Sequence, residues 1–216
     1  DGDNDLDVII TDNDKGVIIY INNKGIFERS EYVVPISTHV SYAKFLNINN
    51  DEYLDLLVEN DGFIRCFINN QGEGFTFFTK IEGLGNDFDQ ITVFDLNNDN
   101  FEDIIVQSQQ YPKMEMNPLE SLEDYVNGLK GLKIKIKTSC LINKLGTFIE
   151  IQHKFENTSQ GIIQPVDVDD DGDKDVFVTN IGNIENTEEW SSFYMNKDSK
   201  FRKRTSNIMS YSLGKS

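Results

Sequence analysis

A short acidic motif recurs four times along this chain, and its spacing limits the fold more than any other feature. The copies read DGDNDLDVII, NINNDEYLDLLV, DLNNDNFEDIIV and DVDDDGDKDVFV. Each has an Asp directly before an apolar run, and these closing aspartates are Asp7, Asp55, Asp103 and Asp175. They are 48, 48 and 72 residues apart. Equal spacing indicates an internal repeat, and the longer third interval indicates an insertion into one copy.

A second landmark fixes the register of the repeat. An apolar triplet is followed by Asn, with an aromatic residue a few positions on, at Asn22, Asn69, Asn143 and Asn196. From each Asn to the next closing aspartate is 33, 34 or 32 residues, so the extra length lies before Asn143. We therefore place an insertion at residues 107–132. Its Asn117, Pro118 and Gly128 are typical of helix ends and predict a short helix over 118–127, which could bind a partner or only decorate the surface.

Within a repeat, the apolar runs are short, rich in β-branched and aromatic residues, and separated by Asn, Asp and Gly. Repeat two predicts four strands, VSYAKFLN, YLDLLVEN, FIRCFINN and FTFFTKI. Four short strands in about 45 residues are typical of a β-propeller blade. We expect an all-β chain, with residues 1–216 forming one β-propeller region of about four blades within a larger ring. The alternative is a four-bladed ring, in which residues 209–212 supply the first strand of blade one.

The acidic loops have the oxygen pattern of a calcium site. Counting loop four from Asp167, carboxylates stand at positions one, three, five and nine, and Gly172 at position six allows a sharp turn. Alternate side chains of a tight loop face one centre, and Ca²⁺ takes several oxygen ligands, including backbone carbonyls such as that at position seven. An EF-hand needs Glu at position twelve before a helix, but Val178 stands there in a strand pattern.

The same numbering gives candidate ligands in every loop, and we expect up to four Ca²⁺. Amides replace some carboxylates in loops two and three, so affinity should fall from loop four to loop three to loop two. A metal-free Asx turn is the alternative for any single loop, above all for loop two. The candidate ligands are Asp167, Asp169, Asp171, Asp173 and Asp175; Asp95, Asn97, Asp99, Phe101 and Asp103; Asn47, Asn49, Asp51, Tyr53 and Asp55; and Asp1, Asp3, Asp5 and Asp7.

The pattern DxDxDGxxD before an apolar strand, recurring with N-x-x-G-x-F, resembles the FG-GAP/VCBS repeats of integrin alpha chains and of many bacterial and protist surface proteins. The resemblance spans essentially all 216 residues. It implies a propeller, usually seven-bladed, with Ca²⁺ in the hairpin loop between the first two strands of a blade. No literal Phe-Gly…Gly-Ala-Pro motif is present, so an integrin-type ligand site has no support from the sequence.

Composition excludes several classes of function. The chain has 37 Asp and Glu against 20 Lys and Arg, a net charge of −17, which disfavours binding to nucleic acid or anionic lipid. No apolar run approaches the ~18 residues of a membrane span, so we expect no membrane insertion in this segment. Cys66 and Cys140 hold the same place in their repeats, three residues before the landmark Asn, and we expect both to be buried free thiols.

Two functional classes remain open. The first is a calcium-binding, extracellular or cell-surface propeller that acts as a noncatalytic adhesion scaffold for a protein or glycan ligand, as part of a larger assembly. The second is a carbohydrate-active propeller enzyme, such as a Ca²⁺-dependent polysaccharide lyase. His39 and His153 lie in no recognisable catalytic motif, and the low content of His and Arg favours the first class. Loops of this kind need extracellular concentrations of calcium, which places the protein outside the cytosol.

Overall fold

In a computed structural model, the chain forms antiparallel β-sheets throughout the part that can be described. That part comprises residues 2–3, 5–36, 39–85, 87–110, 135–153, 155, 162–179, 191–197 and 199–204. It contains 15 strands in four sheets and no helix, and therefore no helix that could span a membrane. The helix predicted over 118–127 and most of the predicted insertion lie outside the described residues. The insertion starts later than predicted, because Gln107 to Gln110 continue a strand.

Each sheet is a meander whose strands follow one another in chain order. Sheet one has β1 (Val8–Asp12), β2 (Gly16–Asn23) and β3 (Ile26–Arg29). Sheet two has β4 (Val40–Leu46), β5 (Asp55–Asn60), β6 (Phe63–Asn69) and β7 (Phe75–Ile81). Sheet three has β8 (Asp87–Phe94), β9 (Asp103–Gln110), β10 (Lys135–Lys144) and β11 (Thr147–Ile151), and sheet four has β12 (Ile163–Val166), β13 (Asp175–Thr179), β14 (Ser191–Lys197) and β15 (Lys200–Lys203). The four strands predicted for repeat two are confirmed to within two residues.

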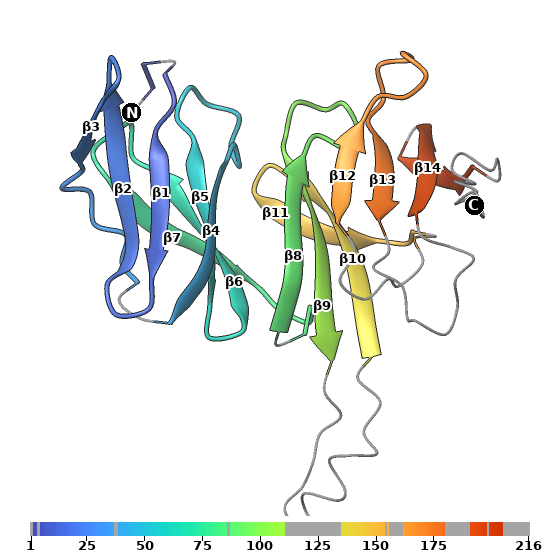
Figure 1. Ribbon diagram of the computed structural model, residues 1–216, viewed down its shortest axis with the longest axis horizontal. Coiled ribbons are helices and arrows are strands. Elements are labelled where there is room, and N and C mark those ends of the chain that lie inside the picture. Colours follow the sequence, from blue (N-terminus) through green and yellow to red (C-terminus); the bar gives the residue numbers. More distant parts are fainter. Residues whose placement is uncertain are drawn as a thin grey trace, which may run out of the picture.

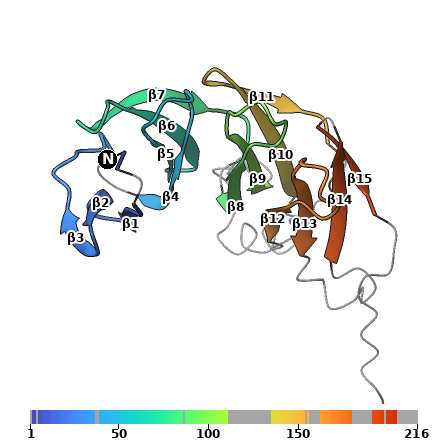
Figure 2. The same ribbon diagram turned by 90° about the horizontal axis from the view of Figure 1, so that it is seen from above.

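The four sheets stand face to face along an arc (Figures 1 and 2). Strands β4, β8 and β12 lie on the inner side of the arc, and β3, β7, β11 and β15 lie on its outer side. Strand β1 follows an acidic loop as β5, β9 and β13 do, so sheet one corresponds to the second, third and fourth strands of the other sheets. This repetition brings the acidic loops to one edge of the arc, the upper edge in Figure 1.

Three apolar cores hold the arc together, one between each pair of neighbouring sheets. The central core joins sheets two and three through residues such as Leu57, Ile64 and Ile104. Strand β5 contributes to two cores at once. Leu57 packs into the central core, and its neighbours Leu56 and Val58 pack into the core between sheets one and two. A strand that is buried on both faces has a continuous apolar sequence, as the run after each closing aspartate does.

The two cysteines belong to these cores. Cys66 and Cys140 are free and fully buried, as predicted, in the central core and in the core between sheets three and four. Burial raises the pKa of the Cys66 thiol to about 12, and it also raises the pKa of Cys140. Both side chains therefore act as small apolar groups.

Two of the landmark asparagines, Asn143 and Asn196, fasten their sheet to the one before it. The Asn143 side chain accepts a hydrogen bond from Gly146 N (2.7 Å) and donates one to Ile48 O in loop two (2.9 Å). Asn196 repeats the second contact, donating to Leu96 O in loop three (2.8 Å). Asn143 thus closes a turn in its own sheet and links that sheet to the previous loop.

Replacing Asn143 by Ala should lower the free energy of unfolding by about 2–4 kcal/mol, because Gly146 N and Ile48 O would both lose a buried partner. Urea unfolding followed by circular dichroism measures the change. Asn22→Ala is the matched control: Asn22 accepts the same turn bond, from Gly25 N (2.7 Å), but is only partly buried, so about 1 kcal/mol is expected. Equal losses in the two variants would contradict the role of Asn143 between sheets.

A second contact between sheets depends on a missing side chain. Gly146 has a φ of +86°, and a Cβ placed on it would lie 2.6 Å from the Phe78 ring of strand β7. Gly25 holds the same turn position in sheet one with a φ of +92°, but a Cβ there would meet nothing within 4 Å. Both turns need a residue with a left-handed backbone conformation, but only in the turn of sheet three would a Cβ also collide with a neighbouring side chain.

We expect Gly146→Ala to destabilise the protein by about 2 kcal/mol, against about 1 kcal/mol for Gly25→Ala, because backbone strain is common to both and the contact with Phe78 is not. Thermal unfolding compares the two variants. Adding Phe78→Ala should remove the difference between them. If the two glycine variants still differed by the same amount in that background, the ring would not be the cause.

Candidate metal centres

Three of the four closing aspartates are buried carboxylates that tie their loop to the third strand of the sheet, and Asp7 is half-buried. Asp55, Asp103 and Asp175 are fully buried. In loop three, Asp103 accepts hydrogen bonds from Leu96 N (2.9 Å), at loop position two, and from the landmark Asn143 N (2.7 Å). The same pair of bonds, from loop position two and from the landmark Asn, reaches Asp55 in loop two and Asp175 in loop four. The sequence predicts these aspartates as ligands but gives no hint of this second role.

Loop four gathers the strongest set of oxygens. Asp167, Asp169 and Asp175 each offer a carboxylate oxygen within 4.8 Å of the others. One oxygen of Asp167 accepts a hydrogen bond from Gly172 N (3.1 Å), while its Oδ1 is buried without a hydrogen-bond partner. Asp171 lies outside this group and accepts a bond from Asp173 N (3.0 Å). Three converging carboxylates with an orphaned buried oxygen fit a hard cation such as Ca²⁺.

The electrostatics of the loops also favour a cation. Desolvation and the neighbouring carboxylates of Asp171 and Asp175 raise the pKa of Asp169. Burial raises the pKa of Asp103 to about 6 and also raises that of Asp55, although backbone N–H groups oppose the change. In each case the ionised form is costly where it stands, and a bound cation would offset that cost.

Loop three is a weaker version of loop four. Asp95 accepts hydrogen bonds from Asp99 N (3.2 Å) and Asn100 N (2.8 Å), so both of its oxygens bond to the loop backbone. Asn97 donates from its amide to Asp99 Oδ2 (2.9 Å). This amide hydrogen offsets part of the negative charge of the Asp99 carboxylate, as a bound cation would.

In loop two, two side-chain amides donate hydrogen bonds to Asp51, against one to Asp99 in loop three. The amides of Asn47 and Asn49 donate to the backbone oxygen and to Oδ2 of Asp51, at 2.8 and 2.7 Å. Glu52 stands at position six, where Gly172 of loop four and Asn100 of loop three have a positive φ and Glu52 does not. The turn of loop two therefore differs in shape from the turns of loops three and four.

Loop one is described in part, and Asp1 lies outside the described residues. Asp7 accepts a bond from the landmark Asn22 N (2.9 Å), and the buried Oδ1 of Asp5 has no hydrogen-bond partner. Asp3 accepts a bond from Asp5 N (3.0 Å). The same contact, from the N–H at position seven to the carboxylate at position five, recurs in the other loops at Tyr53, Phe101 and Asp173.

Neighbouring loops also touch one another, which the sequence analysis missed. Glu102 of loop three accepts a hydrogen bond from Asn47 N of loop two (2.6 Å). Asn98 of loop three donates to Asp173 Oδ1 (2.6 Å) and to Gly172 O (3.3 Å) of loop four. No local pattern could show these contacts, because they join residues 55 and about 75 positions apart. The only signal for these contacts in the sequence is that both partners belong to acidic loops, which the repeat brings to one edge of the arc.

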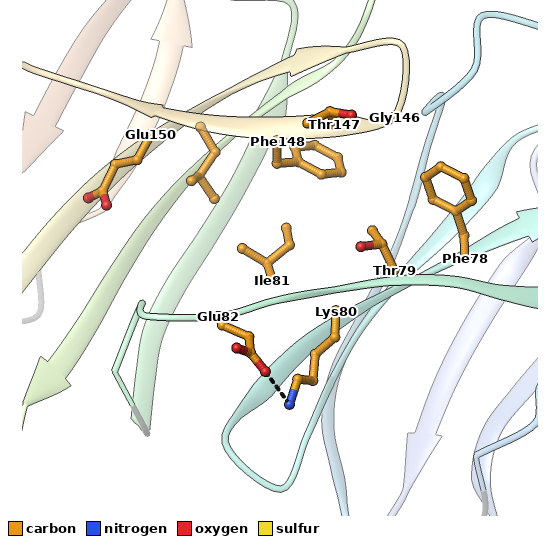
Figure 3. Close-up of a pocket in the computed structure, with 10 residues that line it drawn as sticks. Phe78, Thr79, Lys80, Ile81, Glu82, Gly146, Thr147, Phe148 and Glu150 are labelled. Carbon is orange, nitrogen blue, oxygen red and sulfur yellow. Dashed lines mark ion pairs between the residues drawn. The ribbon is translucent and has the colours of Figure 1, made fainter.

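A pocket of about 360 Å³ lies on the outer side of the arc, between β7 and the β10–β11 hairpin (Figure 3). Phe78, Ile81 and Phe148 give it an apolar centre. Charged pairs flank that centre: Lys80 with Glu82 (2.6 Å) in sheet two, and Glu150 with a lysine of β10, Lys137 (2.8 Å), in sheet three. The pocket is therefore lined by both apolar and charged side chains.

The histidines have structural surroundings. His153 Nε2 lies 2.7 Å from Thr138 O, and its Nδ1 accepts a hydrogen bond from Phe155 N (3.2 Å). A neutral ring protonated at Nε2 satisfies both contacts. His39 is exposed and lies 3.4 Å from Asp61 at a backbone φ of +55°.

Comparison with known proteins agrees with the repeat that these loops define. A family model described as an FG-GAP-like repeat matches residues 1–58 and 47–106. A search of curated proteins gives no match. The two matched segments include loops one, two and three and the strands that follow them. The chain therefore belongs to the FG-GAP-like repeat family.

Proposed function

We propose that this chain is a calcium-binding segment of a β-propeller and that it acts as a noncatalytic scaffold holding a protein or glycan ligand outside the cytosol. The observation that carries the proposal is loop four, where three carboxylates converge and Asp167 Oδ1 is buried without a hydrogen-bond donor. Asp167, Asp169, Asp171 and Asp175 would hold the ion there, with the corresponding residues of the other loops holding further ions more weakly. Bound Ca²⁺ would neutralise the loops and stiffen the hairpins that they join.

Closure into a ring is part of the proposal. The four sheets already lie along an arc, and each inner interface joins one face of a sheet to the opposite face of the next. The face of sheet one that points away from sheet two is apolar, with Val8, Ile10 and Phe27 exposed by 38, 45 and 51 %. Surface of this kind in a repeat protein supports a further sheet packed against it.

A scaffold role fits the surface better than catalysis does. The alternative lyase needs a base in a cleft, whereas both ring nitrogens of His153 are engaged with the backbone and Lys80 and Lys137 are paired with Glu82 and Glu150. The pocket between β7 and the β10–β11 hairpin would offer a partner both polar and apolar contacts instead. Because the chain carries a charge of −17, a neutral or basic partner surface suits it.

Calcium should stabilise the protein against heat. A site with a Kd of ~10 µM contributes about 2.7 kcal/mol at 1 mM free Ca²⁺, which raises Tm by about 5–10 °C for a chain of this size. Differential scanning fluorimetry with Ca²⁺, with Mg²⁺ and with a chelator measures the shift. Mg²⁺ should give a much smaller change, because it prefers few carboxylates and retained waters. A Tm that changes neither with Ca²⁺ nor with chelator would contradict the proposal.

Asp169→Asn should change stability in opposite directions with and without Ca²⁺. Without the ion, the variant should be as stable as the wild type or slightly more stable, because a carboxylate repelled by Asp171 and Asp175 is removed. With the ion, its Ca²⁺ affinity should fall by at least about tenfold, since a ligand charge is lost. Isothermal titration calorimetry measures the affinity, and thermal unfolding measures the stability.

Asp170→Asn is the matched control for that variant. Asp170 stands at position four of the same loop with a φ of +57°, which Asn adopts readily, and the change removes one charge at a position that is no candidate ligand. We expect an affinity within about threefold of the wild type, as for an exposed charge nearby. Equal losses of affinity in the two variants would mean that only the net charge of the loop matters, not its ligand positions.

A further inference from the structure

Sheet three reaches over to the cation loop of sheet two. The Glu102 side chain stands at position eight of loop three, and its Oε2 accepts a hydrogen bond from Asn47 N at 2.6 Å. Hydrogen bonds to carboxylates are stronger than those between neutral groups. Position eight is Leu6, Leu54 and Lys174 in the other three loops, so loop three alone carries an acid there.

A second bond from sheet three holds the next residue of loop two. Asn143 donates from its amide to Ile48 O (2.9 Å), and its own N–H donates to Asp103 Oδ1 (2.7 Å). Asp103 and Glu102 are adjacent in the chain. The conformation of loop three at these two residues therefore sets the position of residues 47 and 48, with which loop two begins.

Loop two is the loop that needs such help. Its first two candidate ligands are the amides Asn47 and Asn49, whereas loop four has carboxylates at both positions. A carboxylate that bonds to the N–H of the first ligand adds negative charge beside the site without taking a ligand position. Charge close to a divalent ion changes its affinity even when the two do not touch.

We propose that sheet three completes the cation site of loop two: Glu102 positions its first ligand, supplies the missing negative charge and couples the site to loop three. The inference rests on the proposed binding of Ca²⁺ by these loops. Order in loop three, when its own ion binds, fixes Glu102 and Asn143 and so prepares loop two. By linkage, an ion in loop two strengthens binding in loop three by the same factor.

The contact between loops three and four has a different character. Asn98 donates to Asp173 Oδ1 (2.6 Å), and a neutral amide brings no charge to loop four. Loop four also has its own three converging carboxylates. The coupling should therefore be strongest between loops two and three, and the Ca²⁺ affinity of loop four should depend little on Glu102.

The test is Ca²⁺ titration of the whole chain by calorimetry, for the wild type and for Glu102→Gln. The substitution keeps an oxygen that can accept the bond from Asn47 N and removes only the charge. Glu73→Gln is the control, because Glu73 is exposed in the β6–β7 turn, whose Asn69 also contacts loop two, and the change loses the same charge without altering the acceptor of Asn47 N. Asp51→Asn identifies the signal of loop two, and unfolding in chelator verifies that every variant folds.

Glu102→Gln should weaken the loop-two site by about fivefold or more and leave the loop-four site and the Tm in chelator unchanged. Asp99→Asn, which removes the loop-three ion, should also weaken loop two, and Glu102→Gln should then add less than it does alone. Equal loop-two affinities in Glu102→Gln and Glu73→Gln, or Ca²⁺ uptake without any loop-two site, would overturn this proposal alone. Absence of any Ca²⁺ uptake by the wild type would overturn the proposed function with it.

Discussion

The buried closing aspartate is the interaction on which the rest of this structure depends. One carboxylate, such as that of Asp103, accepts the N–H of loop position two and the N–H of the landmark Asn, and thereby joins the first hairpin of the sheet to its third strand. The apolar run that follows it fills two cores at once. The same residue thus ends a polar loop, starts a strand buried on both faces and fixes the register between three strands. A neutral apolar residue could do only the second of these.

This arrangement puts an ionisable group where ionisation is costly. Burial raises the pKa of Asp55 and Asp103, and two backbone N–H groups compensate only in part. A cation beside the carboxylate would favour the ionised form that accepts both bonds, so ion binding and folding of the hairpin would share one free energy. The acidity of the chain then has a structural cause: negative charge is concentrated at the residues that organise each sheet.

Much of the fold could be predicted from the sequence, because the same pattern of acidic loop and apolar strand occurs four times. The strands of repeat two and the burial of Cys66 and Cys140 follow from local pattern and register. The contacts of Glu102 with Asn47 and of Phe78 with Gly146 do not, since they depend on how neighbouring sheets pack rather than on any nearby residue. The landmark Asn stands between these cases: its recurrence is plain in the sequence, but the bond from Asn143 to Ile48 O depends on the position of the preceding sheet.

Several contacts between sheets run backward along the chain, from a residue of one repeat to the loop of the repeat before it. Asn143 and Asn196 each donate backward to the second residue of the previous loop, Ile48 and Leu96, and Glu102 also reaches backward. An interface of this kind is heterologous, so every inner sheet supports its predecessor and is supported by its successor. Stability then grows with each neighbour added, as in other repeat proteins. Loop two illustrates this support, because its Asn47 N bonds to the Glu102 carboxylate of the following repeat.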